Sequence, residues 1–277
     1  SASGGEGSLT YAWDNGGGSS AANNTLPAGI YTVTVSDGNL CTNTATTTIT
    51  EPTPVSVTIV NTSVTCNSGN NGTATATGAG GQGGFTYAWD GGAGTTPIAT
   101  GLTATTYTVV ATDGNGCTAT ATTTITEPAA LNLTVVNTSI TCPGDNDGTA
   151  TATGTGGTGT FLYTWNNGVG PGATVTGLTN ISYTVTATDG NGCFTDAQTL
   201  IAAPTPITVT ASSTPADCNG DANGGISASA SGGEGSLTYA WDNGGGTNAT
   251  NNALPAGTYI VTVTDGNLCT NTATAAI

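Results

Sequence analysis

The 277-residue sequence contains no lysine, arginine, histidine or methionine, and its 16 aspartates and glutamates give a net charge of −16. Nucleophilic triads need an imidazole and Schiff-base chemistry needs an amine, so both are excluded. Nucleic-acid binding depends on cations that neutralise phosphates, and an acidic chain is repelled by nucleic acids and by anionic membranes. No apolar run is long enough to span a bilayer. We therefore expect neither nucleic acid as a partner nor insertion into a membrane.

Carboxylates alone could still hydrolyse a glycosidic bond, because that reaction needs only two of them. The acids that recur in every period of the sequence are Asp37, Asp113, Asp189 and Asp265, one per period. A catalytic pair duplicated along a chain in this way is improbable. The composition therefore predicts a protein that is not an enzyme, with no catalytic residues.

A fixed interval of 76 residues organises the sequence. Residues 1–49 match residues 229–277 at 40 of 49 positions, at an offset of three periods. A period without insertions indicates a tandem array of one domain, so we expect the chain to be a section of a longer array. The tryptophans at this interval are Trp13, Trp89, Trp165 and Trp241, and the cysteines form two series, Cys41, Cys117, Cys193 and Cys269, and Cys66, Cys142 and Cys218.

Proline-containing linkers such as Glu51-Pro52 and Glu127-Pro128 close the periods. They divide the chain into repeat 1 (residues 1–51, the C-terminal part of a repeat), repeat 2 (52–127, complete), repeat 3 (128–203, complete) and repeat 4 (204–277, nearly complete).

Each repeat has the pattern of short β-strands. Tyr107 to Ala111 alternates apolar and threonine residues, Asp113-Gly114 is a tight-turn signal, and helical periodicity is absent. Seven or so strands at this spacing predict an all-β fold, namely tandem immunoglobulin-like antiparallel β-sandwich domains. After Val60 the alternation of apolar residues shifts by one position. This shift indicates that the first strand is broken by a bulge or switches between sheets.

The aromatic residues are expected to be structural. Phe85, Tyr87 and Trp89 share one face of a strand, as a core tryptophan does in sandwich domains, so we place all four tryptophans in cores. The tyrosines at 31, 107, 183 and 259 are expected to form tyrosine corners. The competing hypothesis is that the tryptophans stack on sugars, which would make the chain a carbohydrate-binding, lectin-like array.

A family resemblance rests on residues 80–89, 101–117 and 125–128. They read Gly-Gly-x-Gly…Tyr-x-Trp-x-x-Gly…Gly-x-Tyr-Thr-Val-x-x-x-Asp-Gly-x-x-Cys…Ile-Thr-Glu-Pro, although repeat 2 has Thr105-Thr106-Tyr107 where repeats 1 and 4 have Gly-x-Tyr. This pattern resembles the SprB-type repeat of gliding-motility adhesins of Bacteroidota, and its core is similar to polycystic-kidney-disease-type sandwich domains. The resemblance implies export through the type IX pathway and a long filament on the cell exterior.

The combined expectation is a structural stalk segment of an extracellular, filament-forming adhesin. Short linkers that contain proline leave little freedom between domains, which predicts a stiff rod. Regular cysteines in small, core-poor domains indicate an oxidising, extracellular location. The expected partners are neighbouring repeats of the same chain, other filament chains and a surface polysaccharide or substratum.

Calcium is the one candidate cofactor. Asp145 and Asp147 in one glycine-containing loop, and Asp217 and Asp221 in its equivalent, offer the oxygen ligands that calcium prefers. The equivalent loop of repeat 2 has only asparagines, and both residue types are common in turns.

Two disulfide pairings compete. Pairing within a repeat, such as Cys66–Cys117, would staple a small domain. In an immunoglobulin-like sandwich, however, these two positions lie at opposite poles, about 26 Å apart along a strand, whereas bridged Cα atoms lie about 4.4–6.8 Å apart. That topology favours pairing between neighbours, Cys66–Cys193 and Cys142–Cys269. A first strand that folds back at Asn61 would restore the pairing within a repeat.

Overall fold

The computed structural model describes residues 1–277, and all of its regular elements are β-strands, which confirms the expected fold class. None of its segments is a helix long and apolar enough to cross a membrane. The chain divides into two compact units. Unit 1 comprises residues 1–63 and 70–126, and unit 2 comprises residues 64–69 and 127–277.

In unit 1, repeat 2 is a sandwich of two three-stranded antiparallel sheets, ordered β4-β5-β7 and β6-β8-β9. This is the immunoglobulin arrangement, in which the third strand carries the tryptophan and leaves the first sheet for the second. The strands are β4 (Ser56–Thr62), β5 (Gly72–Ala79), β6 (Thr86–Trp89), β7 (Ile98–Leu102), β8 (Thr106–Thr112) and β9 (Thr118–Thr124).

Repeat 1 contributes only one sheet to unit 1, because its sequence begins after the first two strands of a repeat. The apolar face of this sheet is uncovered and borders a hollow of about 570 Å³ lined by Leu9, Tyr11, Trp13 and Val33, among others. Trp13 is therefore half-buried, whereas its equivalents in the two-sheet repeats are buried. The sheet consists of β1 (Thr10–Trp13), β2 (Gly29–Ser36) and β3 (Thr42–Ile49).

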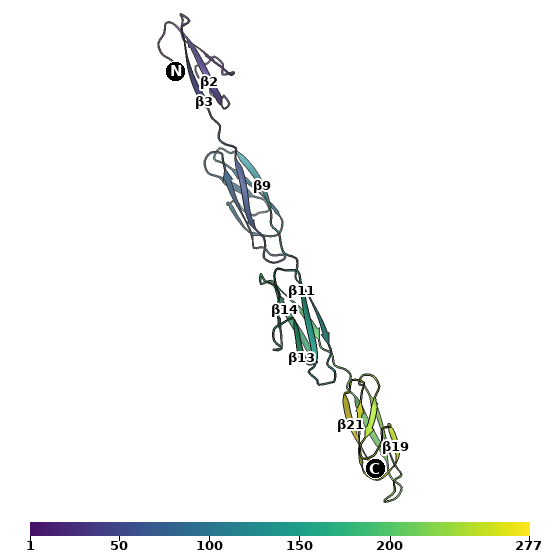
Figure 1. Ribbon diagram of the computed structural model, residues 1–277. Coiled ribbons are helices and arrows are strands. Elements are labelled where there is room, and N and C mark those ends of the chain that lie inside the picture. The colour runs from purple at the N-terminus through teal and green to yellow at the C-terminus, as the bar shows by residue number, and fades with distance from the viewer. The chain divides into compact units, whose positions relative to one another are not determined.

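In unit 2, repeats 3 and 4 each repeat the two-sheet arrangement, and Figure 1 shows β11 and β13 of one sheet with β14 of the other. Repeat 3 contains β10 (Asn132–Thr138), β11 (Gly148–Thr155), β12 (Leu162–Trp165), β13 (Thr174–Leu178), β14 (Ser182–Thr188) and β15 (Phe194–Leu200). Repeat 4 contains β16 (Thr208–Thr214), β17 (Gly224–Ser231), β18 (Thr238–Trp241), β19 (Thr250–Leu254), β20 (Thr258–Thr264) and β21 (Thr270–Ala276).

Each complete repeat has six strands, fewer than the seven or so expected. The core follows the alternation read from the sequence. On β14, Tyr183, Val185 and Ala187 point inward and are at most 3% exposed, while the intervening threonines face outward. Threonine suits these outer positions because its branched side chain favours strands and carries no charge.

The segment that follows the first strand turns toward the second sheet, at the place where the alternation of apolar residues shifts. In repeat 3, β10 pairs in continuous register with β11 up to Thr138. The amide of Asn137 then donates to the carbonyl of Leu200 at 3.2 Å, and the backbone N–H of Ile140 donates to the carbonyl of Ala202 at 3.1 Å. The paired part of the first strand contains no bulge, and the register shift of this sheet lies in β11, between Gly148 and Thr149.

Tyrosine and tryptophan fix the loops that join the sheets. The Tyr183 hydroxyl accepts a hydrogen bond from the backbone N–H of Thr179 at 3.1 Å, which is a tyrosine corner. The Trp165 indole N–H donates to the carbonyl of Gly172 at 2.9 Å. The rings of Trp89, Trp165 and Trp241 are 7–8% exposed, so their faces are covered by protein and are not presented to a ligand.

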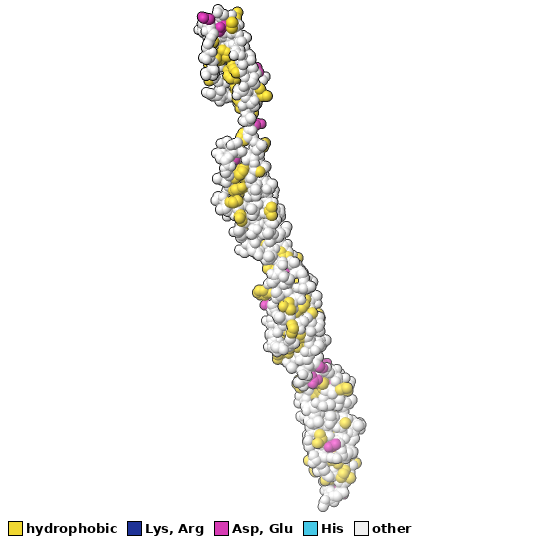
Figure 2. All heavy atoms as spheres, turned by 60° about the vertical axis from the view of Figure 1, so that its left-hand side comes forward, with side chains coloured by type: hydrophobic (Ala, Val, Ile, Leu, Met, Phe, Trp, Pro, Cys, Tyr) yellow, Lys and Arg dark blue, Asp and Glu magenta, His cyan; other side chains and the backbone are white.

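The outer surface is largely uncharged. Figure 2 shows carboxylates as isolated spots, no cationic side chain, and hydrophobic side chains in small separate patches. With no cation present, no ion pair between side chains can form. Each sandwich is therefore held by apolar packing and strand hydrogen bonds.

Candidate functional site: the disulfide-linked junctions

Two disulfides link segments far apart in the sequence of unit 2. Cys66 is bonded to Cys193, with the two Cα atoms 5.8 Å apart, and Cys142 to Cys269, with the Cα atoms 5.5 Å apart. Both span 127 residues and join the loop after the first strand of one repeat to a turn of the following repeat. This is the pairing between neighbours, and the pairing within a repeat does not occur.

The turn that presents Cys193 is built on Asp189. This residue directly follows β14, and it is 6% exposed. Its Oδ1 accepts hydrogen bonds from the backbone N–H groups of Asn191 and Cys193, both at 2.9 Å. Its Oδ2 accepts one from the N–H of Thr158 at 2.8 Å. The carboxylate therefore holds the cysteine-bearing turn and a glycine-rich loop together.

Ionisation of this buried acid depends on its hydrogen bonds. Burial of Asp189 opposes its charged form, but backbone hydrogen bonds, led by that from Thr158, outweigh it and hold the carboxyl pKa below its ordinary value. At Asp265 the backbone hydrogen bond from Glu234 is the leading cause of the same lowering of the pKa. Both acids are thus charged near neutral pH, although no cation lies beside them.

The glycine-rich loop can lie this close to Asp189 only because residue 157 is a glycine. Gly157 has a φ of +58°, and a Cβ atom there would lie 2.7 Å from the Oδ2 of Asp189 and 2.5 Å from the side chain of Leu131. Only glycine fits both the backbone conformation and the space. This explains the pair of glycines that recurs before the third strand of each repeat.

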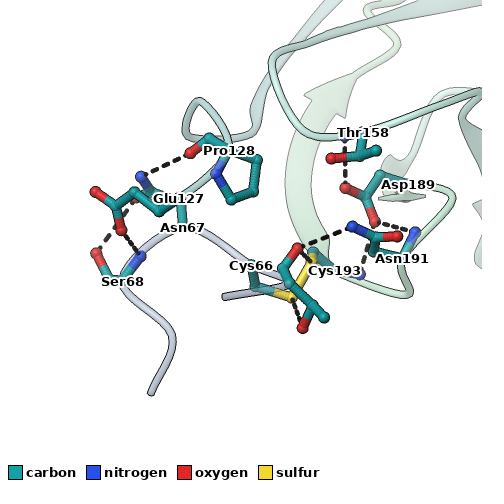
Figure 3. The surroundings of a disulfide bond; sticks show 10 residues. Cys66, Asn67, Ser68, Glu127, Pro128, Thr158, Asp189, Asn191 and Cys193 are labelled. Carbon is teal, nitrogen blue, oxygen red and sulfur yellow. Dashed lines mark hydrogen bonds between the residues drawn. A yellow bond between two sulfur atoms is a disulfide. The ribbon is translucent and has the colours of Figure 1, made fainter. Parts of the chain in front are cut away.

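The loop that carries Cys66 makes three further hydrogen bonds (Figure 3). The Asn191 amide donates to the carbonyl of Thr65 at 3.1 Å, so the residue between Asp189 and Cys193 also contacts the partner loop. The amide of Asn67 donates to the carbonyl of Pro128 at 3.1 Å, and the N–H of Ser68 donates to the carboxylate of Glu127 at 2.6 Å. The linker residues Glu127 and Pro128 are therefore part of the junction.

The second junction relies more on apolar packing. Cys269 is 6% exposed, and Cys142 packs against the same hydrophobic cluster of repeat 4. The positions equivalent to Glu127 and Asn67 are occupied by Ala203 and Pro143, which cannot make the side-chain hydrogen bonds of the first junction. The disulfide and its turn are thus common to both junctions, while the linker contacts differ.

An open hollow of about 380 Å³ lies beside the first disulfide, lined by Cys66, Asn67, Pro128, Leu131, Asp189 and Phe194, among others. Its acid is already engaged by three backbone donors, and no cation lies in its wall.

The structure does not gather the calcium candidates into one cluster, since no group of three or more acidic, cysteine or histidine side chains suited to a metal occurs in residues 1–277. Asp147 accepts hydrogen bonds from the backbone N–H and hydroxyl of Thr141, and Asp145 accepts one from the N–H of Cys142. The side-chain amide of Asn223 donates a hydrogen bond to the carboxylate of Asp217, and the N–H of Asp221 donates to the carbonyl of Cys218. Calcium binding stays a prediction, tested by whether chelation destabilises repeat 3 more than repeat 2.

These features define a class of protein, an array of small immunoglobulin-like sandwiches in which successive repeats are joined by disulfides. The sequence profile of the SprB repeat matches residues 58–94, 134–170 and 210–246, with the 76-residue spacing of the repeats. Three segments of the chain, one in each two-sheet repeat, are thus similar to the SprB repeat. Each match runs from the first strand past the tryptophan.

Solved structures with similarity to the chain are extracellular or surface-layer arrays at low identity. They include the N-terminal eight Ig domains of Down syndrome cell adhesion molecule, with 10% identity and a TM-score of 0.29 over 97% of this chain and 56% of that one. Domains 1–6 of the surface layer protein SbsC share 14% identity, with a TM-score of 0.27 and coverage of 97% and 49%. Protocadherin gamma B2 cadherin domains 3–6 share 12% identity, with a TM-score of 0.27 and coverage of 97% and 91%.

The chain thus spans about half the length of the first two of these structures. Among curated proteins no match was found.

Sequence reasoning missed the functional role of two residues at the junction. Asp189 was noted only as a recurring acid in a turn, and Asn191 was not singled out. A signal was present, because every repeat contains Asp-Gly-Asn-x-Cys at the same place. In this motif the aspartate holds the turn, the cysteine forms the bond, and Asn191 contacts the partner loop.

Proposed function

We propose that the chain is a load-bearing stalk segment of an extracellular, filament-forming adhesin. Its finer assignment as a gliding-motility protein exported through the type IX pathway follows from the resemblance to SprB adhesins and is part of this proposal. We propose no catalytic activity, because the composition removes the nucleophile and base chemistry that most enzymes use.

The observation that carries the proposal is the overlap of the two disulfide loops. Residues 66–193 and 142–269 are both closed by a covalent bond, and residues 142–193 lie inside both loops. A pull along the chain is thus transmitted across repeat 3 through disulfides as well as through folded strands. Unfolding cannot release the full length of either loop while its disulfide is intact.

Force spectroscopy on the 277-residue chain tests the mechanical function. An unfolded segment extends by about 3.4 Å per residue, so a loop of 127 residues withholds on the order of 400 Å of extension. We expect short unfolding steps for the oxidised chain and a total extension longer by several hundred ångströms after reduction. Equal extension before and after reduction would contradict load transmission through the junctions.

A carbohydrate-binding array is the alternative from another functional class. The burial of Trp89, Trp165 and Trp241 weighs against sugar stacking on these rings. Fluorescence quenching of a Trp13→Phe variant, which keeps only the three buried tryptophans, separates the two functions, because a stalk predicts blue-shifted emission that soluble glycans do not change. Emission that is readily quenched and sensitive to sugar would support the lectin instead.

A further inference from the structure

Both halves of the junction also occur unpaired in the chain. Cys41, Cys117 and Cys218 form no disulfide and are exposed. Cys41 and Cys117 occupy the turn position of Cys193 and Cys269, whereas Cys218 occupies the loop position of Cys66 and Cys142. Within residues 1–277, the turn cysteines Cys41 and Cys117 have no loop cysteine 127 residues before them. The loop cysteine Cys218 has no turn cysteine 127 residues after it.

The unpaired turn of repeat 2 already has the geometry of a bonded turn. The N–H of Cys117 donates to the Oδ1 of Asp113 at 2.8 Å, compared with 2.9 Å for Cys193 on Asp189. Asp113 is 5% exposed and also accepts from the N–H of Gln82 at 2.8 Å. The turn thus forms without the disulfide, and its thiol is exposed before any bond to a partner is made.

The unpaired loop of repeat 4 likewise repeats the backbone of the bonded loops. The carbonyl of Cys218 accepts a hydrogen bond from the N–H of Asp221 at 3.1 Å. The carbonyls of Cys142 and Cys66 accept the equivalent bonds from Asp145 and Gly69, both at 3.0 Å. Three different loop sequences therefore place the cysteine in the same tight turn.

We propose that these thiols are docking sites for further SprB repeats, each specific for the complementary half. Cys218 takes the turn cysteine of an Asp-Gly-Asn-x-Cys motif in a repeat that follows it, 127 residues further along the chain, the separation of both existing disulfides. Cys117 takes the loop cysteine of a repeat that precedes it. This inference rests on the junction geometry and holds whether or not the chain acts in adhesion.

The reaction that closes a new junction is thiol–disulfide exchange with a small-molecule disulfide such as oxidised glutathione. The two protein thiols are oxidised to one disulfide, the small disulfide is reduced to two thiols, and the two thiol protons end on these products. Preformed turns lower the conformational cost of the step, because the loop and the turn need no rearrangement before they meet.

The test is an extended chain in which a copy of residues 50–127 follows Ile277 directly, continuing the array in phase. The copied Cys117 then lies 127 residues after Cys218, as in the existing disulfides. After oxidative folding with a glutathione buffer, thiols are alkylated and disulfides are mapped by mass spectrometry. Digestion uses an acid- or aromatic-specific protease, because the chain has no lysine or arginine.

We expect Cys218 to be alkylated completely in the original chain and to lose this alkylation in the extended chain, where it is bonded to the copied Cys117. Cys117→Ser in the copy alone is the matched control and should restore alkylation of Cys218. A disulfide between the copied Cys66 and the copied Cys117 would overturn the proposal, as would a free Cys218 in the extended chain. Retention of the Cys66–Cys193 and Cys142–Cys269 disulfides in the same digest verifies the folded array.

Discussion

Residues 1–49 and residues 229–277 share 40 of 49 positions, yet they differ in burial. Val261 and Val263 on β20 are fully buried, whereas their equivalents Val33 and Val35 on β2 are half-buried. The difference arises from β16 and β17, which together with β19 cover one face of the sheet in repeat 4 and have no counterpart in repeat 1. The same sequence thus forms the same sheet with or without a second layer.

Features that depend on local contacts are the same in both regions. The Tyr31 hydroxyl donates to the carbonyl of Pro27 at 3.1 Å, and the Tyr259 hydroxyl donates to that of Pro255 at 3.0 Å. The N–H of Cys41 donates to Asp37 at 2.9 Å, and that of Cys269 to Asp265 at 2.9 Å. The tyrosine corner and the aspartate turn are therefore properties of the three-stranded sheet, while the closed core requires the preceding hairpin.

The largest expected effect is completion of repeat 1. A copy of residues 204–228 placed directly before Ser1 supplies the missing hairpin in phase and should close the hollow beside Trp13. A closed small domain is typically stable by about 5 kcal/mol or more, so amide exchange on β2 should slow by several orders of magnitude. Hydrogen exchange measured by mass spectrometry resolves these segments.

The matched control for that extension is Ile226→Asp in the added copy. Ile226 is 1% exposed in repeat 4, so a charge at the equivalent place should prevent closure. Rapid exchange of β2 with the unmodified hairpin in place would show that the missing strands are not the reason for its exposure.

The second-largest expected difference between repeats 1 and 4 is the loss of stability when the tryptophan is replaced by alanine. Trp241→Ala opens a cavity in a closed core and should lower the local stability of repeat 4 by about 3–5 kcal/mol. Trp13→Ala removes a half-buried ring and should cost repeat 1 much less. Hydrogen exchange on β20 and β2 gives both values, and equal losses would mean that the core of repeat 4 is not closed around Trp241.

Much of this fold could be predicted from the sequence because its period and alternation are strong. The sandwich class, the tyrosine corner and the end of the first strand all follow from residues close in sequence or from the alternation of apolar residues. The expectation of seven or so strands is too high, because whether a short segment pairs into a sheet depends on residues far away in the sequence. The role of Asn191 depends on a loop 126 residues away, a distance over which no local pattern operates.

A smaller difference should arise from the cysteines. Cys269 is buried and bonded to Cys142, while Cys41 is exposed and unpaired. Cys269→Ser should destabilise unit 2 by about 2–4 kcal/mol, the usual effect of losing a disulfide, and Cys41→Ser should have no measurable effect. The double variant Cys142→Ser/Cys269→Ser should lose as much as the single variant in thermal unfolding. A much larger loss for the single variant would point to damage by an unpaired thiol.

The smallest expected difference concerns pH and the two turn aspartates. Backbone hydrogen bonds, led by that from Glu6 at Asp37 and from Glu234 at Asp265, hold the pKa of both carboxyls below the ordinary value. A carboxyl with a lowered folded-state pKa stabilises the protein above its unfolded pKa, and this stabilisation is lost as the pH falls through the folded pKa. Asp265 is 4% exposed and Asp37 is half-buried, so solvent should weaken the effect at Asp37. Asp265→Asn should therefore lower stability at neutral pH and flatten its decline below about pH 4, with Asp37→Asn doing the same to a lesser degree. Melting curves between neutral pH and the acid limit of folding measure how stability changes with pH in both variants. An unchanged decline of stability with falling pH in Asp265→Asn would mean that the buried carboxylate does not couple folding to pH.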